Sequence, residues 1–121
     1  MSSRKRLGDF GERIAAAHLE AQGYVILHRN YRRRDCEIDL VAVRDGVVAF
    51  VEVKTRRGSS MGSAIEGVTD IKAERLLRGV ERYGYEHPDL PPDRRIDIIA
   101  IDLAPDGRVL SVEHIENAIV R

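Results

Sequence analysis

The residues that decide the fold are 37–57, with the sequence EIDLVAVRDGVVAFVEVKTRR. Two runs of alternating apolar residues flank the pair Asp45 and Gly46, and Asp-Gly in that setting predicts a β-hairpin with a type I′ turn. In the register that this turn sets, Asp39 lies directly opposite Glu52, with the two Cβ atoms about 5 Å apart. The stretch therefore predicts a hairpin that holds two carboxylates side by side.

Apolar residues cover both faces of the predicted hairpin, so we expect the carboxylate pair at the end of a buried sheet. They are Ile38, Leu40, Ala42, Ala49, Val51 and Val53 on one face, and Val41, Val43, Val48 and Phe50 on the other. Opposed like charges destabilise a sheet, and a buried charge without a partner is especially costly. A divalent cation relieves this repulsion, and carboxylate oxygens at that spacing suit Mg²⁺ or Mn²⁺.

A simpler interpretation of the same residues is also open. Glu37 is predicted to face Lys54, one pleat beyond the acidic pair, and these two could form an ordinary cross-strand ion pair. Asp39 and Glu52 would then share only the edge of a solvated face. The register decides between the two interpretations, because a one-residue bulge at the turn would move Asp39 to the opposite face of the sheet.

The composition is typical of one globular domain with a highly charged surface. The 121 residues are 43% hydrophobic and 33% charged, and they suffice for a single core. No hydrophobic run is long enough to span a membrane, and the N-terminal MSSRKRLGDF has no apolar stretch of the kind that a secretory signal needs. The single cysteine, Cys36, excludes an intramolecular disulfide and fits a reducing cytoplasm.

Charge is unevenly distributed along a chain whose formal net charge is zero. The first half carries the excess of lysine and arginine, as expected if the predicted carboxylate site must face phosphates. The densest positive patch, Arg29 with Arg32, Arg33 and Arg34, comes just before the hairpin. It would clamp phosphates beside the site, or it would be an ordinary solvated loop. Aromatic residues make up only 5% of the chain, which argues against a surface that stacks bases.

Residues 7–22 are predicted to form the first helix, after a flexible tail of residues 1–6. Four residues at helical spacing are expected to form its core face: Phe10, Ile14, Ala17 and Ala21. A second strip lies roughly opposite and consists of Gly8, Glu12, Ala15 and Leu19. The small residues of this strip would let another backbone come close. Glu12 is therefore either a carboxylate on a packed face or an ordinary exposed helix residue.

The rest of the chain predicts a second helix and three more strands. Strands are expected at residues 24–30, 95–103 and 109–115, and a loop at 58–63. The second helix is expected from Thr69, its N-cap, to Tyr85. Its buried residues would be Ala73, Leu76, Leu77, Val80 and Tyr83, and its solvent face would carry Arg75, Arg78 and Arg82. Residues 116–120 would form a short helix or tail. The order α-β-β-β-α-β-β predicts a single-domain α/β fold, a mixed sheet flanked by helices.

This order of elements and acidic residues resembles the PD-(D/E)xK nuclease superfamily, which has the restriction-endonuclease-like fold. The matching pattern is Glu12 in the first helix, Asp39 in the hairpin, and then Glu52-Val53-Lys54. The layout is similar to that of archaeal Holliday-junction resolvases, and the closer resemblance is to the YraN-like family of small bacterial proteins. It covers nearly the whole chain, through Gly8-x-x-Gly11-Glu12, Asn30-Tyr31-Arg32, Glu37-Ile38-Asp39-Leu40, Phe50-Val51-Glu52-Val53-Lys54-x-Arg56, Lys72 and Arg95-x-Asp97. The chain departs from that family's pattern at Cys36, where Gly is more common.

The resemblance implies a metal-dependent nuclease site. Asp39 and Glu52, with the main-chain carbonyl of Val53, would hold one or two Mg²⁺ or Mn²⁺ ions, which activate a water and neutralise charge on the phosphate. Lys54 would orient or deprotonate that water, and Glu12 would touch the metal through water or bind a second ion. Six basic residues would bind nucleic acid: Arg32, Arg33, Arg34, Arg56, Arg57 and Lys72.

Three functions are compatible with these patterns. The first is a metal-dependent endonuclease of the bacterial cytoplasm that hydrolyses phosphodiester bonds in structured or branched DNA, with DNA favoured over RNA as the partner. The second is a nucleic-acid-binding module that does not cleave, and the third is a small scaffold in a larger assembly. A junction-cutting enzyme would need two copies of the chain, so the first function also implies a homodimer, and none of the three requires a membrane.

Overall fold

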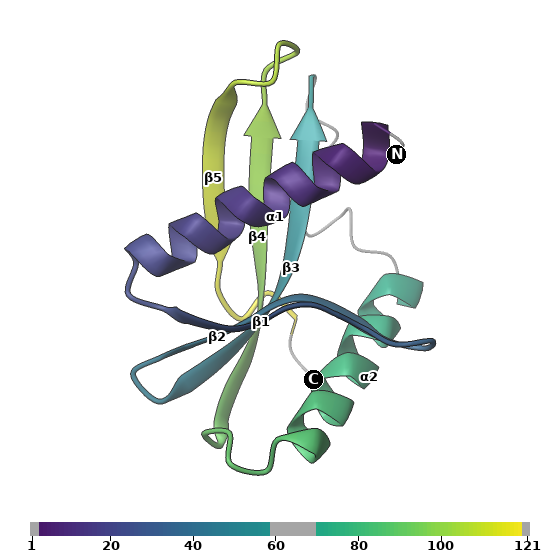
Figure 1. The fold of residues 1–121 in the computed structure, drawn as a ribbon, viewed down its shortest axis with the longest axis vertical. Helices are drawn as coiled ribbons and strands as arrows, with labels where there is room; N and C mark the ends of the chain where they lie inside the picture. The colour runs from purple at the N-terminus through teal and green to yellow at the C-terminus, as the bar shows by residue number, and fades with distance from the viewer. Residues whose placement is uncertain (1–2, 59–69, 120–121) are drawn as a thin grey trace.

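The computed structural model describes residues 3–58 and 70–119, which form one five-stranded sheet and two helices (Figure 1). The elements are α1 (Ser3–Ala21), β1 (Val25–Arg32), β2 (Glu37–Arg44), β3 (Val47–Arg57), α2 (Asp70–Glu86), β4 (Asp93–Leu103) and β5 (Val109–Ile115). The predicted α-β-β-β-α-β-β order and the mixed α/β sheet are confirmed. Within the described residues, neither helix has the length and apolar character needed to cross a membrane.

The strands lie in the sheet in chain order, and the sheet mixes antiparallel and parallel pairs. β3 and β4 run parallel, and the other neighbouring strands run antiparallel. Parallel neighbours require a crossover connection, and α2 forms part of this one. The predicted loop beyond Gly58 and the predicted N-cap Thr69 fall in residues 59–69, outside the described part of the chain.

The hairpin of β2 and β3 has the predicted turn and register. Asp45 and Gly46 have φ angles of 50° and 76°, the two positive values that a type I′ turn requires. From this turn the strands pair in the predicted register as far as Leu40 and Val51, without a register shift. The bulge that would have moved Asp39 to the other face of the sheet is therefore absent from this pairing.

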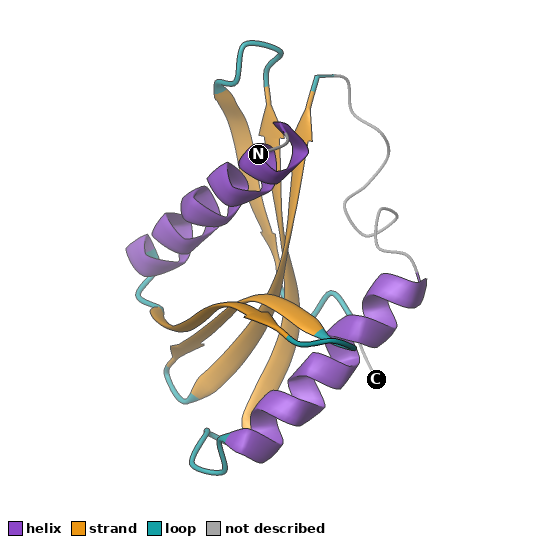
Figure 2. Ribbon diagram, turned by 45° about the vertical axis from the view of Figure 1, so that its right-hand side comes forward, coloured by secondary structure: helices purple, strands orange, loops and turns teal. Residues whose placement is uncertain are grey.

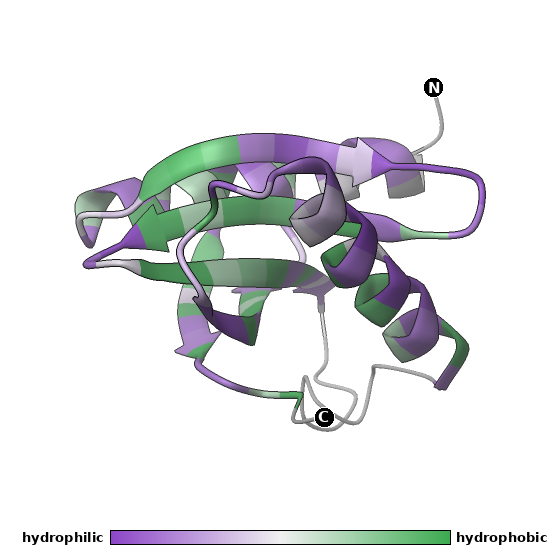
Figure 3. Ribbon diagram, turned by 90° about the horizontal axis from the view of Figure 1, so that it is seen from below, coloured by the Kyte–Doolittle hydropathy of each residue, from purple (hydrophilic) through white to green (hydrophobic). Residues whose placement is uncertain are grey.

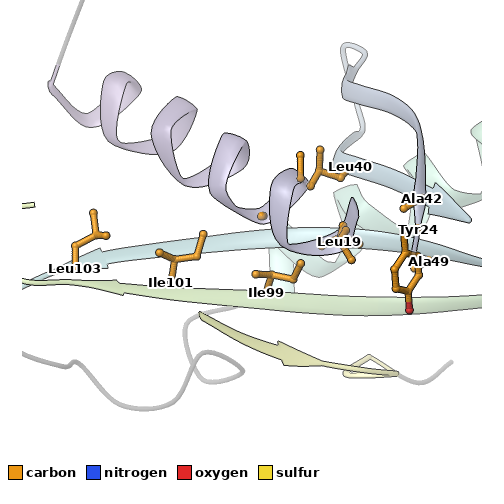
Figure 4. Close-up of a cluster of buried hydrophobic side chains, with 11 residues drawn as sticks. Leu19, Tyr24, Leu40, Ala42, Ala49, Ile99, Ile101 and Leu103 are labelled. Carbon is orange, nitrogen blue, oxygen red and sulfur yellow. The ribbon is translucent and has the colours of Figure 1, made fainter. Parts of the chain in front are cut away.

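The two helices pack against opposite sides of the sheet (Figure 2), and a hydrophobic cluster lies beneath each of them. Figure 4 shows the cluster under α1, which includes Leu19, Tyr24, Leu40, Ala42, Ala49, Ile99, Ile101 and Leu103. The cluster under α2 includes Tyr31, Ile38, Val41, Val48, Phe50, Leu76, Val80 and Tyr83. Figure 3 shows the central parts of the strands as hydrophobic, as expected for a sheet covered on both faces.

The buried face of α1 differs from the prediction. Ala17 and Ala21 are exposed, whereas Ala15 and Leu19 of the second strip are buried. The reason is Gly11, where an added Cβ would lie 1.8 Å from the Oγ1 atom of Thr55 on β3. A glycine at this point lets α1 approach β3 more closely than any side chain would allow, and this contact sets the rotation of the helix.

The start of α1 also corrects the prediction of a tail. The helix begins at Ser3 rather than Leu7, so residues 3–6 belong to it. Lys5 forms an ion pair with Asp9 one turn later, with Nζ 3.3 Å from Oδ2, and such an i,i+4 pair supports the first turns of a helix.

The remaining boundaries differ from the predictions by a few residues. β1 extends to Arg32 and thus includes Tyr31, which packs under α2 rather than lying in a loop. β4 begins at Asp93, two residues early, and β5 has the predicted bounds. Residues 116–119 form a turn and an irregular segment rather than a helix.

Candidate functional site

A cavity of about 530 Å³ lies where β2 and β3 stop pairing, between α1 and the start of α2. Its lining residues are Leu7, Gly8, Glu12, Arg32, Glu37, Asp39, Val53, Lys54, Thr55 and Lys72. They come from both helices and from the first three strands, so the cavity exists only in the folded chain. Most of the residues predicted to form the site, from segments far apart in the sequence, therefore meet in one place.

Asp39 lies next to Leu40, the last residue of β2 that pairs with β3. Its Oδ2 atom accepts a hydrogen bond from the main-chain N–H of Val53, with 2.8 Å between the heavy atoms. Its carboxyl group also lies close enough to that of Glu52 for each to affect the pKa of the other. Asp39 is 8% exposed and Glu52 is 2% exposed. The structure thus places the two acidic side chains together and out of solvent, as the register predicts.

The main chain of Val53 faces the same gap between the strands. A residue of an antiparallel strand directs its N–H and C=O to the same side, because hydrogen-bonded partners exchange both bonds. The N–H of Val53 points to Asp39, and no residue of β2 pairs with β3 beyond Val51. The Val53 carbonyl therefore belongs to the edge of β3 that lines the cavity, where the sequence predicted a ligand.

Lys72 reaches the acidic pair from the first turn of α2. Its Nζ atom lies 2.6 Å from the Oε1 atom of Glu52. A lysine in the first turn of a helix is on the unfavourable, positive end of the helix dipole. The contact with Glu52, rather than helix stability, accounts for a lysine at this position.

Glu12 reaches the cavity from α1, with a side chain that is 14% exposed. Its Oε2 atom lies 3.5 Å from Arg32 Nη2, and its buried Oε1 atom has no hydrogen-bond partner among the described residues. The same Arg32 nitrogen lies 3.5 Å from Asp39 Oδ1, and Arg32 also pairs with Glu37. Arg32 is therefore the cation shared by three acidic side chains of the cavity.

The carboxyl groups of Glu12, Asp39 and Glu52 resist ionisation. Burial raises the pKa of Glu12 to about 7 and that of Glu52 to about 7, and the charge of Asp39 adds to the effect in both. Burial also raises the pKa of Asp39, although the hydrogen bond from Val53 opposes the rise. Such shifts in three neighbouring acids indicate a site that is short of positive charge.

The two lysines of the cavity are in different electrostatic surroundings. Burial lowers the pKa of Lys54, and the nearby charge of Lys72 lowers it further. Burial also opposes the charging of Lys72, but its contact with Glu52 outweighs this effect and raises its pKa. Lys54 is thus the lysine that more easily gives up its proton, as a group that takes a proton from water must. Lys72 remains a cation.

The residues of the cavity fit a divalent cation at Asp39 and Glu52. The described ranges hold no group of three or more His, Cys, Asp or Glu side chains arranged to bind a metal ion. Mg²⁺, however, commonly uses only one or two carboxylates and completes its coordination with water and substrate phosphates. A cation here would give the Oε1 atom of Glu12 a partner, and it would lower the raised pKa values of Glu12 and Glu52.

The other basic residues predicted to bind nucleic acid lie outside the cavity. Arg33 lies over the ring of Tyr31, 4.3 Å from its centroid, and the carbonyl of Arg34 accepts a hydrogen bond from Arg75 of α2. Arg56 pairs with an aspartate of β4, and Arg57 is the last residue of β3. The structure therefore gathers Arg32 and Lys72 at the carboxylates and places the other four in the loop after β1 and at the end of β3.

Two contacts around the cavity were not predicted from sequence. The first is the close approach of Gly11 to Thr55, for which the Gly8-x-x-Gly11-Glu12 pattern was the available signal. The second is Arg75, predicted on a solvent face, whose Nε atom lies 3.7 Å from Glu37 Oε1. Neither hydrophobic spacing nor charge pattern reveals this second contact, because it depends on how α2 docks against β2.

Comparison with known proteins places the chain among close relatives of similar length. Residues 11–101 match the family described as uncharacterised protein family UPF0102. The UPF0102 protein of Frankia alni is 45% identical over 119 residues, which cover 98% of each chain. That of Symbiobacterium thermophilum is 46% identical over 114 residues, covering 94% of this chain and 96% of the relative. That of Roseiflexus castenholzii is 43% identical over 118 residues, covering 96% and 94%.

Proposed function

The chain belongs to the UPF0102 family, the YraN family, and from the geometry of its cavity we propose that it is a metal-dependent endonuclease that hydrolyses phosphodiester bonds in structured or branched DNA. The observation that carries the proposal is the buried contact between Asp39 and Glu52, with two lysines in the same cavity. Two buried carboxylates side by side destabilise a fold, so a purely structural role does not account for them.

Each side chain of the cavity has a role in this proposal. Asp39 and Glu52, with the Val53 carbonyl, would hold Mg²⁺ or Mn²⁺, which supplies an activated water and neutralises charge on the phosphate. Lys54, with its lowered pKa, orients or deprotonates the attacking water. Glu12 would contact the same ion through water, or a second one.

The cationic side chains position the substrate strand. Arg32 holds Glu12 and Asp39 in place and presents its remaining donors to the cavity. Lys72 neutralises Glu52, and it would be able to bind a phosphate if a metal ion occupied that carboxylate.

The resemblance in layout to junction-resolving nucleases supports branched DNA as the substrate. Cutting a junction symmetrically requires two active sites, so the proposal includes a homodimer. A nuclease acting on chromosomal DNA would work in the bacterial cytoplasm.

A cleavage assay tests the proposal. The full chain is incubated with Mg²⁺ or Mn²⁺ and a panel of DNA duplexes, flaps, four-way junctions and RNA. We expect nicking of at least one branched DNA, lost in Asp39→Asn and Glu52→Gln and kept in the control Asp102→Asn. In Asp39→Asn the side-chain amide oxygen can still accept the hydrogen bond from the Val53 N–H, so this variant should fold. Absence of metal-dependent cutting from the whole panel would reject the proposal.

The contact of Lys72 with Glu52 favours one second candidate, a nucleic-acid-binding module that does not cleave. In that case the lysine would be a permanent counter-ion rather than one that yields to a metal. This function predicts salt-dependent DNA binding without cleavage, and log affinity that stayed flat against log salt concentration would exclude it.

A further inference from the structure

A second cavity adjoins the candidate site on the other side of Glu12. It has a volume of about 360 Å³ and lies between α1 and β1, lined by Lys5, Asp9, Glu12, Arg13, Arg29, Asn30 and Leu40. Glu12 lines both this cavity and the one that holds Asp39. The two cavities therefore form neighbouring compartments with one shared wall.

The shared wall is built from three polar side chains. Arg32 Nη2 donates to Asn30 Oδ1 across 3.1 Å and lies 3.5 Å from Glu12 Oε2, so Arg32 contacts both of the other side chains. Asn30 has a φ of 55°, a backbone conformation that Asn tolerates better than most residues. This conformation sets Asn30 apart from the regular strand residues of β1.

Two arginines of the second cavity have weak local partners. Arg29 Nη2 lies 3.9 Å from Glu20 Oε1, at the limit of an ion pair, and both side chains are at least half exposed. The guanidinium of Arg13 lies over the ring of Phe10, 5.9 Å from its centroid. Exposed contacts of this kind contribute little free energy and are easily exchanged for a stronger partner.

The chemistry of this compartment suits a phosphodiester. Arginine donors match phosphate oxygens in geometry and charge, and charge-assisted hydrogen bonds of this type are the stronger ones. The compartment is open and polar, with only Leu40 as an apolar lining residue. An anionic group in this cavity would offer both guanidinium groups a stronger partner than their present exposed contacts.

We propose that the cavity between α1 and β1 binds a backbone phosphate of the same nucleic-acid strand that enters the carboxylate cavity, through Arg13 and Arg29. The strand then crosses Glu12, with one phosphate in each compartment. This inference rests on the proposed function for the identity of the ligand, a polynucleotide backbone. It adds Arg13, and it assigns Arg29, part of the basic patch predicted from sequence, to a particular cavity.

The test measures binding rather than cleavage. A fluorescein-labelled oligothymidylate is titrated in EDTA with the full-length wild type, with the double variant Arg13→Gln/Arg29→Gln, and with the double variant Arg94→Gln/Arg108→Gln. The control pair removes the same charge from the start of β4 and from the turn before β5. Glutamine keeps the length of the side chains, and circular dichroism confirms folding.

We expect the Arg13/Arg29 variant to bind at least several-fold more weakly. We also expect its slope of log affinity against log salt to fall by about 1.4, because each contact to a single strand contributes about 0.7. The control pair should stay close to the wild type. An unchanged slope, an equal loss in both double variants, or no binding by the wild type would overturn the inference.

The cleavage panel separates this inference from the proposed function. If the wild type cleaves DNA but the Arg13→Gln/Arg29→Gln variant has the same salt slope as the wild type, the phosphate site between α1 and β1 is rejected and the endonuclease function is kept. If that variant has a reduced salt slope and the wild type cleaves no substrate, the phosphate site is kept and the hydrolytic function is rejected.

Discussion

Lys72 Nζ lies 2.6 Å from Glu52 Oε1, so the first turn of α2 is tied to the middle of β3 at the acidic pair. The side chain of Glu52 is 3% exposed, and Lys72 supplies a positive charge beside the two carboxyl groups. The contact links the packing of α2 to the chemistry of the cavity. It also places Lys72 in competition with any cation that binds Glu52.

Replacing Lys72 tests this competition. We expect Lys72→Met to bind Mn²⁺ several-fold more tightly than the wild type, because it removes the positive charge nearest to Glu52. Isothermal titration calorimetry measures the change. The matched control is Arg82→Met, which removes a charge from the distal half of α2 and should leave the affinity unchanged. Unchanged or weaker Mn²⁺ binding by Lys72→Met would show that the lysine does not compete with a metal.

The contact of Gly11 with Thr55 predicts a loss of stability on adding one methyl group. Gly11→Ala forces a Cβ to within 1.8 Å of Thr55 Oγ1, and we expect the free energy of unfolding to fall by about 1–3 kcal/mol. Urea denaturation measures this loss.

Two further variants identify its cause. In Gly8→Ala the new Cβ meets nothing within 4 Å, so the protein should gain about 0.5–1 kcal/mol from helix propensity. In a Thr55→Gly background, Gly11→Ala should cost much less than in the wild type. An equal cost in both backgrounds would mean that the close packing of α1 on β3 is not responsible.

Asp97 predicts how stability depends on pH. It is fully buried on β4, where its carboxylate accepts hydrogen bonds from Arg95 Nε and the N–H of Asn117, both at 2.9 Å. Burial raises the pKa of Asp97, but the hydrogen bonds of His114 and Arg95 outweigh it, and the pKa falls below its usual 3.8. Because the folded pKa is the lower one, this stabilisation is present above the unfolded pKa and is lost as pH falls through the folded pKa.

Urea denaturation of wild type and Asp97→Asn across the acidic range checks this dependence. The variant leaves Arg95 without its buried partner, and near neutral pH we expect it to lose about 3–5 kcal/mol. The difference between the two proteins should shrink below about pH 4, as the wild-type carboxylate becomes protonated. The pair of Asp102 with Arg56 provides the control: the side chain of Asp102 is 36% exposed whereas that of Asp97 is fully buried, so Asp102→Asn should cost less than Asp97→Asn. A difference between wild type and Asp97→Asn that stays constant with pH would contradict the assignment.

The parts of the structure that could be predicted from sequence are those fixed by local chemistry. Asp45 and Gly46 define the turn, and the turn defines the register as far as Leu40 and Val51. Asp39 and Glu52 lie together just beyond the last of these pairs. Alternation along the strands identified the buried hairpin. The order of helices and strands followed from their hydrophobic periods.

The parts that could not be predicted depend on how separate elements dock. The rotation of α1 follows from one glycine against β3, although a longer apolar stripe pointed to another face. The pairing of Lys72 with Glu52 depends on where the crossover delivers α2. Arg95-x-Asp97 was part of the family pattern, yet Asp97 anchors the segment around Asn117 and does not line the carboxylate cavity.

The most direct test of the central claim is calorimetric titration of Mn²⁺ into the wild type, Asp39→Asn, Glu52→Gln and the control Asp102→Asn, because it requires no knowledge of the substrate. If Asp39 and Glu52 jointly hold a cation, the wild type and the control bind Mn²⁺ with the same heat, and neither cavity variant does. Equal binding by all four proteins, or none by the wild type, would contradict the claim.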